Sequence, residues 1–212
     1  MLQIRWHGHS CFEITNDVKV VTDPHDGKSL GIPAPNVVGD IVLVTHSHYD
    51  HNSVKSVEKS GTKVVTDERK RIISNVEIKG IPAYHDNVQG AKRGKMILYK
   101  FIMQGITFCH LGDLGHELDK KSVEEIGDVD ILFLPIGGTF TLDAEQAKKV
   151  VEMLQPKIVV PMHYKIGGLS LPVAGIDPFI EDNPAKIVRV GNEIDIEKDD
   201  LPKEQEIWVF TL

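Results

Sequence analysis

The amino-acid sequence predicts a four-layer αββα sandwich of the mixed α/β class, in which two mixed β-sheets pack face to face with helices outside. Three observations support this fold class. Short runs of β-branched and apolar residues recur along the chain and outnumber the helical patterns. The helical patterns interrupt these runs, which is typical of sheets that are covered by helices. Neither a repeat of fixed period nor a low-complexity segment occurs.

The expected strands follow one another closely along the chain. They cover residues 2–6, 11–15, 18–22, 41–45, 63–66, 76–79, 96–103, 106–110, 131–134, 158–162, 187–190 and 206–211. Between the second and the third of them, the segment Thr15-Asn16-Asp17-Val18 is a tight-turn signal and predicts a hairpin.

Fewer helices are expected, at residues 53–60, 122–126 and 143–154. The last of them shows the clearest pattern, because its apolar side chains fall on one face: Ala147, Val150, Val151 and Leu154. Thr141 or Asp143 is expected to cap its N-terminus.

Length and charge limit the classes of function. The 212 residues fit a single domain, 1–212, because they only slightly exceed the usual ~100–200 residues per domain. Lys and Arg number 24 against 31 for Asp and Glu, so the net charge is −7. This balance argues against binding to nucleic acid or to an anionic membrane, both of which need a positive field. We expect a small-molecule partner instead, and the sequence leaves the oligomeric state open.

Cysteine usage and hydropathy indicate the compartment. Cys11 and Cys109 lie in apolar runs and are expected to be reduced core thiols. No apolar run approaches the ~18–20 residues that cross a bilayer. The first ten residues include Arg5, His7 and His9 and lack the apolar centre of a signal peptide. We therefore expect a cytoplasmic protein.

The most informative segment is 45–51 (THSHYDH), which directly follows an apolar run. Imidazole is the commonest protein ligand of transition metals, and a carboxylate adds a hard oxygen donor. In an extended segment His46 and His48 point the same way, so they can hold one ion together. A turn at Asp50 and His51 can direct this pair to a second ion. The alternative is a polar turn with surface histidines, an unusual use of four ligand-type side chains after a buried strand.

The spacing His-x-His-x-Asp-His resembles the signature of the metallo-β-lactamase superfamily of metal-dependent hydrolases. That family continues with a third His, an Asp near a Gly, and a last His, each at the end of a strand. The chain offers these in the same order as His85, Asp113 and His163. Two further segments, 6–12 (WHGHSCF) and 134–139 (LPIGGT), resemble the bacterial branch that contains ascorbate-phosphate lactonases.

This resemblance implies the metallo-β-lactamase fold and a set of ligands for two ions. The first ion would be held by His46, His48 and His85, the second by Asp50, His51 and His163, and Asp113 would bridge the two. Three neutral imidazoles leave a tetrahedral ion with an open position for water. A bridging hydroxide could then attack a carbonyl or phosphorus centre, with Asp50 and Asp113 as the catalytic carboxylates. Zn²⁺ fits these ligands best, and Mn²⁺ or Fe is also compatible.

Taken alone, each downstream ligand also has an ordinary explanation. His85 fits a loop histidine, Asp113 fits the cap of a turn, and His163 fits a buried core histidine. Their joint occurrence in the family order favours the metal site.

Further residues are candidates for supporting the ligands or contacting the substrate. Metal-bound His usually donates its other N–H to a carboxylate, and Asp23, at the end of a strand, is the best candidate for this partner. The alternative for Asp23 is a turn residue. His9 and His110 are expected to support ligands or to be purely structural. Lys165 would either meet an anionic group or be solvated, and the loop 167–175 would either shape access to the site or only connect.

Differences from neighbouring subfamilies narrow the predicted function. Di-iron relatives that reduce oxygen or nitric oxide usually carry Glu where this chain has His48, and many zinc β-lactamases carry Cys in place of Asp113. RNA-processing relatives have a large inserted domain for which this chain has no room. The sequence therefore predicts a metal-dependent hydrolase of a small ester, lactone or phosphoester. The alternatives are a di-iron redox enzyme and a metal-containing binding or sensory protein without turnover, and fold alone does not separate them.

Overall fold

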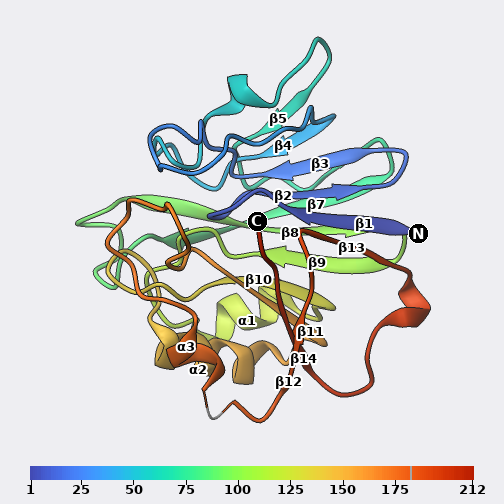
Figure 1. Ribbon diagram of the computed structural model, residues 1–212. Coiled ribbons are helices and arrows are strands. Elements are labelled where there is room, and N and C mark those ends of the chain that lie inside the picture. Colours follow the sequence, from blue (N-terminus) through green and yellow to red (C-terminus); the bar gives the residue numbers. More distant parts are fainter. Residues whose placement is uncertain (182) are drawn as a thin grey trace.

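Two β-sheets stack against each other in the computed structural model, which describes residues 1–181 and 183–212 (Figure 1). One sheet has six strands in the order β13-β1-β2-β3-β4-β5, and the other has eight in the order β12-β14-β11-β10-β9-β8-β7-β6. Both sheets contain parallel and antiparallel pairs. The predicted sandwich of two mixed sheets is therefore confirmed.

The six-stranded sheet consists mainly of N-terminal segments. Its strands are β1 (Leu2–Trp6), β2 (Phe12–Thr15), β3 (Lys19–Thr22), β4 (Ile41–Leu43), β5 (Lys63–Val65) and β13 (Glu193–Ile196). The strands β3, β4 and β5 run parallel, whereas β13, β1, β2 and β3 pair in antiparallel fashion. The hairpin between β2 and β3 agrees with the predicted turn. The sequence did not predict β13, because its alternating acidic residues resemble an exposed loop.

The eight-stranded sheet contains the remaining strands. They are β6 (Arg71–Ile73), β7 (Val76–Tyr84), β8 (Lys95–Met103), β9 (Ile106–His110), β10 (Ile131–Pro135), β11 (Ile158–Met162), β12 (Lys186–Arg189) and β14 (Glu206–Val209). The strands β9, β10 and β11 run parallel. The predicted strand 76–79 continues to Tyr84 through Gly80 and Pro82, which usually weaken a strand, because β7 pairs with β8 along its whole length.

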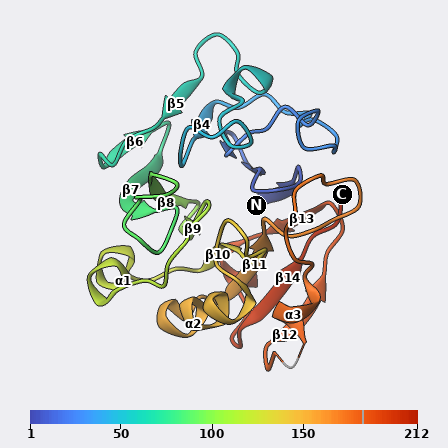
Figure 2. The ribbon, with the colours of Figure 1, turned by 90° about the vertical axis from the view of Figure 1, so that its left-hand side faces the viewer.

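The α-helices cover the outer face of the eight-stranded sheet (Figure 2). They are α1 (Lys120–Ile126), α2 (Ala144–Leu154) and the single turn α3 (Asp177–Ile180). Asp143 caps α2, and its side chain accepts a hydrogen bond from the backbone N–H of Gln146. One-turn 3-10 helices occur as η1 (Val54–Ser56) and η2 (Lys198–Asp200).

The helix predicted at 53–60 is wrong, because only the turn η1 forms there. Ser53 makes no capping hydrogen bond with its side chain. The segment offers few apolar side chains, and its Val57 packs against Val21 and Val42 in a small cluster separate from the main core. The outer face of the six-stranded sheet is therefore covered by turns and loops rather than by a helix.

The parallel strands determine where functional side chains can gather. The inner faces of the two sheets and the inner faces of α1 and α2 share one continuous core that includes Trp6, Phe108 and Phe133. Loops that follow the carboxyl ends of β3, β4, β9 and β11 emerge at one side of the molecule, on the left in Figure 1. Residues placed at those four strand ends are thus brought together although they are far apart in sequence.

Candidate metal centre

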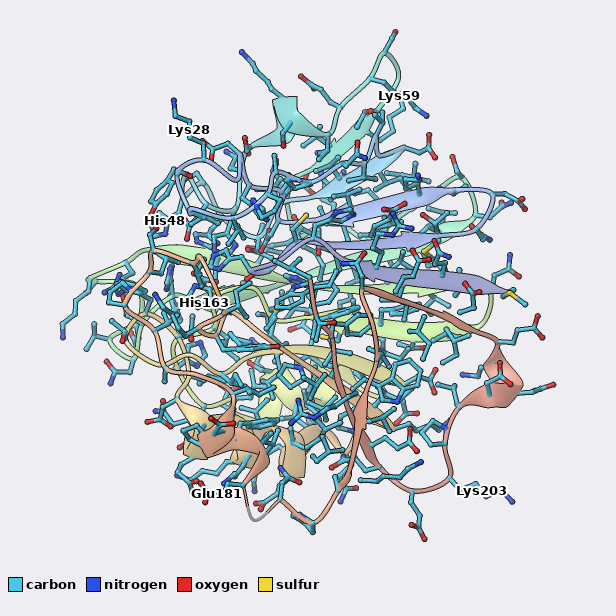
Figure 3. All side chains as sticks on the ribbon, in the orientation of Figure 1. Lys28, His48, Lys59, His163, Glu181 and Lys203 are labelled. Carbon is cyan, nitrogen blue, oxygen red and sulfur yellow. The ribbon has the colours of Figure 1, made fainter. Side chains whose placement is uncertain are left out.

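The seven ligands that the family resemblance implies all lie just beyond the carboxyl ends of strands. His46, His48, Asp50 and His51 occupy the loop after β4. His85 directly follows β7, Asp113 lies three residues beyond β9, and His163 directly follows β11. His48 and His163 accordingly appear on the same side of the molecule in Figure 3. The structure brings all seven together.

The Asp113 carboxylate lies at the centre of this group. Its Oδ1 is 3.1 Å from Nε2 of His51, and its Oδ2 is 3.2 Å from Nε2 of both His85 and His163. The Nε2 atom of His46 is 3.9 Å from Oδ2. Asp113 therefore contacts imidazoles of both expected ligand sets, as a bridging carboxylate would.

Two clusters of donor atoms flank Asp113. In one cluster the ligand atoms of His46, His48 and His85 lie within 4.8 Å of one another. A second cluster, with the same spacing limit, contains Asp50, His51 and His163 and adds His9. A third group, of Asp23, His46 and His51, takes one residue from each of these clusters. The first two clusters contain the sets that the resemblance implies, with His9 added to the second.

His9 lies among the second set of ligands rather than behind it. Its fully buried Nε2 is 3.1 Å from Oδ2 of Asp50 and 3.2 Å from Nε2 of His51. This geometry allows His9 to donate to the Asp50 carboxylate or to face an ion itself. The sequence analysis expected His9 to support ligands or to be structural, and it did not expect His9 to lie within the second set of ligands.

Asp23 connects two of the expected ligands through hydrogen bonds. Its Oδ2 accepts from Nδ1–H of His51 at 2.9 Å and from the hydroxyl of Thr45 at 2.7 Å. Because the single hydroxyl proton of Thr45 is donated to Asp23, its oxygen accepts from Nδ1–H of His46 at 2.9 Å. The relay leaves the Nε2 lone pairs of His46 and His51 free to bind a metal ion. Thr45 was not among the candidates, although it lies between the strand β4 and the ligand motif.

The other two candidates have supporting contacts. Nε2 of His110 lies 2.9 Å from the carbonyl oxygen of Ser10, and its Nδ1 accepts from the backbone N–H of Gly112. It therefore fixes the loop that leads to Asp113. The ammonium group of Lys165 donates to the carbonyl oxygens of Leu169 and Leu171, so it holds the loop 167–175.

Charge in the centre favours a bound cation. Burial would raise the pKa of Asp113, but the imidazoles of His163 and His51 hold it well below its ordinary value. Burial, reinforced by His51, lowers the pKa of His46 to about 3. Burial followed by His163 likewise lowers the pKa of His9 to about 3. Burial would lower the pKa of His51, but the carboxylates of Asp113 and Asp23 hold it well above its ordinary value, so this imidazole carries a proton that a bound cation would displace. The neutral imidazoles of His46 and His9 beside ionised carboxylates are donors of the kind that a divalent metal requires.

Unpaired atoms support the same fit. Within residues 1–181 and 183–212, the buried Nε2 of His46 has no hydrogen-bond partner. Buried polar groups are normally paired, and those left unpaired call for an explanation such as a missing ion. The arrangement of the residues therefore fits a divalent metal centre.

A cavity of about 240 Å³ lies over the centre. Its lining combines five expected ligands with four further loop residues: His48, Tyr49, Asp50, His85, Arg93, Asp113, Phe140, His163 and Leu171. Leu171 belongs to the loop 167–175, which thus forms part of the cavity wall. Arg93 and Phe140 were not among the sequence candidates.

Comparison with known proteins agrees with the fold and the centre. The sequence model of the Beta-lactamase superfamily domain matches residues 3–163, and the chain belongs to this superfamily. It is 31% identical over 190 residues to a UPF0173 metal-dependent hydrolase of Thermococcus onnurineus, an alignment that covers 77% of this chain and 85% of the relative. The family resemblance seen in the sequence is thereby confirmed.

Solved structures show the same fold. A Thermotoga maritima protein described as a Zn-dependent hydrolase of the metallo-β-lactamase superfamily superposes with a TM-score of 0.82 at 36% identity, covering 99% of this chain and 98% of its own. CmlA, a diiron β-hydroxylase from Streptomyces venezuelae, shares the fold at 15% identity and a TM-score of 0.57, over 76% of this chain and 44% of its own. The fold therefore occurs with different chemistries.

No helix in the described residues is long and apolar enough to cross a membrane.

Proposed function

We propose that this protein is a metal-dependent hydrolase with two divalent ions, most simply Zn²⁺, that acts on a small ester, lactone or phosphoester. The observation that carries this proposal is the position of the Asp113 carboxylate, 3.1–3.2 Å from imidazoles of both ligand sets. His46, His48 and His85 would hold one ion, Asp50, His51 and His163 the other, and Asp113 both. When bound, such ions lower the pKa of a coordinated water to about 7 and polarise the bond to be cleaved.

The side chains of the chain itself orient this centre. Asp23 fixes the tautomer of His51 directly and that of His46 through Thr45, so that both Nε2 atoms face Asp113. His9 is placed to hold the Asp50 carboxylate through Nε2. A cavity of about 240 Å³ lies below the ~300–1,000 Å³ of typical ligand pockets, which favours a small substrate.

Composition supports the remaining parts of the proposal. The net charge of −7 favours a small molecule over nucleic acid as the partner. Both cysteines are buried and free, and burial raises the pKa of the Cys109 thiol to about 12. Inert thiols of this kind fit a reducing compartment, so we infer a cytoplasmic protein with one domain spanning 1–212.

Substitution of the bridge tests the proposal. Asp113→Asn removes the charge between the two imidazole sets, and we expect the variant to bind one metal site more weakly and to lose hydrolysis by orders of magnitude while it stays folded. Asp128→Asn, at an exposed position away from the centre, is the matched control. Elemental analysis and a panel of lactones, thioesters and phosphodiesters provide the readouts. A variant that binds two equivalents and turns over normally would disprove the bridge.

The diiron fold relative makes redox chemistry the second candidate. Elemental analysis of protein purified without added metal, together with its optical spectrum, distinguishes the two. Iron with a charge-transfer band would favour the redox enzyme. Two equivalents of zinc with a featureless spectrum would favour the hydrolase. Full zinc loading with no turnover on any substrate would instead indicate a binding or sensory protein.

A further inference from the structure

The wall of the cavity over the metal centre carries a permanent positive charge. Among the residues that line this cavity, all of them within the described part of the chain, Arg93 is the one Arg or Lys. It comes from the loop 86–94 that joins β7 to β8 and starts beside the expected ligand His85. Arg93 is neither an expected metal ligand nor one of the hydrogen-bond partners of these ligands. The metal centre alone therefore does not explain a positively charged side chain at this position.

The loop that carries Arg93 is held rigidly by one carboxylate. Oδ1 of Asp86 accepts the backbone N–H groups of Val88 and Gly90 at 2.9 and 2.8 Å. Its Oδ2 accepts those of Lys92 and Arg93 at 2.9 and 2.7 Å. The four hydrogen bonds close the loop around the Asp86 side chain. The backbone of Arg93 is thus fixed relative to His85, the residue next to Asp86.

The guanidinium group of Arg93 is oriented but has no counter-ion. It lies over the ring of Phe140, 4.6 Å from the ring centroid, where cation–π attraction holds it against the cavity wall. Arg69 and Arg71 each pair with a carboxylate, whereas in residues 1–181 and 183–212 Arg93 has no such partner. A stacked guanidinium keeps its N–H groups free at the edges, and these match the paired oxygens of a carboxylate or phosphate.

We propose that Arg93 binds an anionic group of the substrate, a carboxylate or a phosphate, at the end remote from the bond that is cleaved. This inference rests on the proposed function and names its substrate class: small esters or lactones that carry a second, anionic group. Phe140 is the positioning residue that holds the guanidinium. Leu171, in the loop 167–175, lines the same cavity, and its carbonyl oxygen accepts a hydrogen bond from Lys165. Its side chain offers an apolar contact to the carbon chain of the substrate, between the cleaved bond and the anionic group.

Binding of two-ended anions to the zinc-loaded protein tests the proposal without requiring turnover. Succinate is compared with acetate, and 3-phosphonopropionate with methylphosphonate, by titration calorimetry, with the weaker ligands measured by displacement. One end of each longer ligand can reach the metal centre while the other reaches Arg93. The short ligands supply only the first contact. Both longer ligands can place a carboxylate on the metal centre, so their gains over acetate compare a remote carboxylate with a remote phosphonate. Methylphosphonate reports the affinity of a phosphonate for the metal centre itself.

The key variant is Arg93→Met, and Lys92→Met is its control. Lys92 and Arg93 are both exposed, carry the same charge and donate a backbone N–H to Asp86, but Lys92 does not line the cavity. A lost hydrogen bond to a charged group corresponds to ~1.5–3 kcal/mol, so we expect Arg93→Met to weaken the longer ligands ~10–100-fold. Acetate and methylphosphonate should bind as before, and Lys92→Met should match the wild type. Phe140→Ala should weaken the longer ligands less, and Phe140→Tyr should restore them.

The outcomes separate this inference from the proposed function. If Arg93→Met binds the longer ligands as tightly as the wild type, or loses the short ligands equally, the anion site is disproved. An enzyme that hydrolyses neutral and anionic esters equally well, with and without Arg93, disproves the anion site but leaves hydrolysis intact. A protein that hydrolyses nothing but keeps the binding step that depends on Arg93 disproves the proposed function and retains the site.

Discussion

Replacement of Asp23 by Asn should weaken the metal centre without touching a ligand. The carboxylate is fully buried, and its Oδ1 accepts the backbone N–H of Thr45 at 2.8 Å, while its Oδ2 accepts from Thr45 and His51. In Asp23→Asn, an NH₂ group replaces Oδ2 and donates where the carboxylate accepted. His51 must then carry its proton on Nε2, the atom that faces Asp113, and this proton blocks metal binding.

The size of the effect follows from these contacts. Loss of a hydrogen-bond partner behind a ligating His typically costs 10–100-fold in metal affinity, or ~1.4–2.7 kcal/mol. His51 loses its partner directly, whereas the Thr45 hydroxyl can rotate and accept from the new amide. We therefore expect the full loss at the His51 site and a smaller one at the His46 site. The metal-free protein should lose ~1–3 kcal/mol in its free energy of unfolding, because one buried donor is left poorly paired.

Competition with a chromophoric chelator measures the two affinities, and urea unfolding of the metal-free protein measures stability. Asp26→Asn is a suitable control, because Asp26 lies three residues away and its side chain bonds only to the exposed Ser29. Two equivalents bound by Asp23→Asn with wild-type affinity at both sites would refute the relay from Asp23 to the two imidazoles. Equal weakening at both sites would contradict the ranking of His51 over His46.

Three further changes probe the site and the scaffold. We expect His9→Ala to weaken metal binding at the site of Asp50 ~10–100-fold in chelator competition, a smaller loss than that of Asp113→Asn. An unchanged affinity would mean that His9 has a purely structural role. Asp143→Ala should lower the free energy of unfolding, measured in urea, by ~1 kcal/mol because α2 loses its cap. Asp143→Ser should keep most of the wild-type stability, because Ser is also a good N-cap residue. Burial would raise the pKa of Glu13, but His7 and Lys19 hold it at about 2, so ionised Glu13 stabilises the fold above its unfolded pKa of about 4.5. The stability difference from Glu13→Gln in metal-free protein, ~1–3 kcal/mol, should be constant above pH 5 and vanish as the pH falls towards 2.

The segment 45–51 could be singled out because its signal is local: four ligand-type side chains follow an apolar run. The resemblance to a known family, and not the strand pattern alone, then added His85, Asp113 and His163, and the structure places these residues near that segment. Parallel neighbours then bring such strand ends to one edge, so the sequence order of the ligands maps onto one site. Asp23 could be named as a candidate because it directly follows β3.

The residues that shape the cavity could not be predicted in this way. Arg93 lies in a loop, and its significance arises only when the segment with Phe140, far along the chain, packs beneath it. A partial signal exists, since Asp86 followed by Gly90 and Gly94 is typical of a loop closed on an aspartate side chain. That pattern predicts the loop but not the direction of the guanidinium. The short edge strand β6 was missed because exposed edges lack the alternation of a half-buried strand.

The backbone at the centre adopts unusual conformations that its surroundings must enforce. His9, Asp23 and His163 all have φ in the left-handed region, at 54°, 37° and 53°, which is unusual for residues other than Gly. Such conformations cost ~1–3 kcal/mol each and persist only where the surroundings enforce them. Close packing supplies that enforcement: a Cβ at Gly137 would overlap the carbonyl oxygen of His163, so the two loops touch at the backbone. The same strain explains why local propensity alone would not have placed these three residues in their turns.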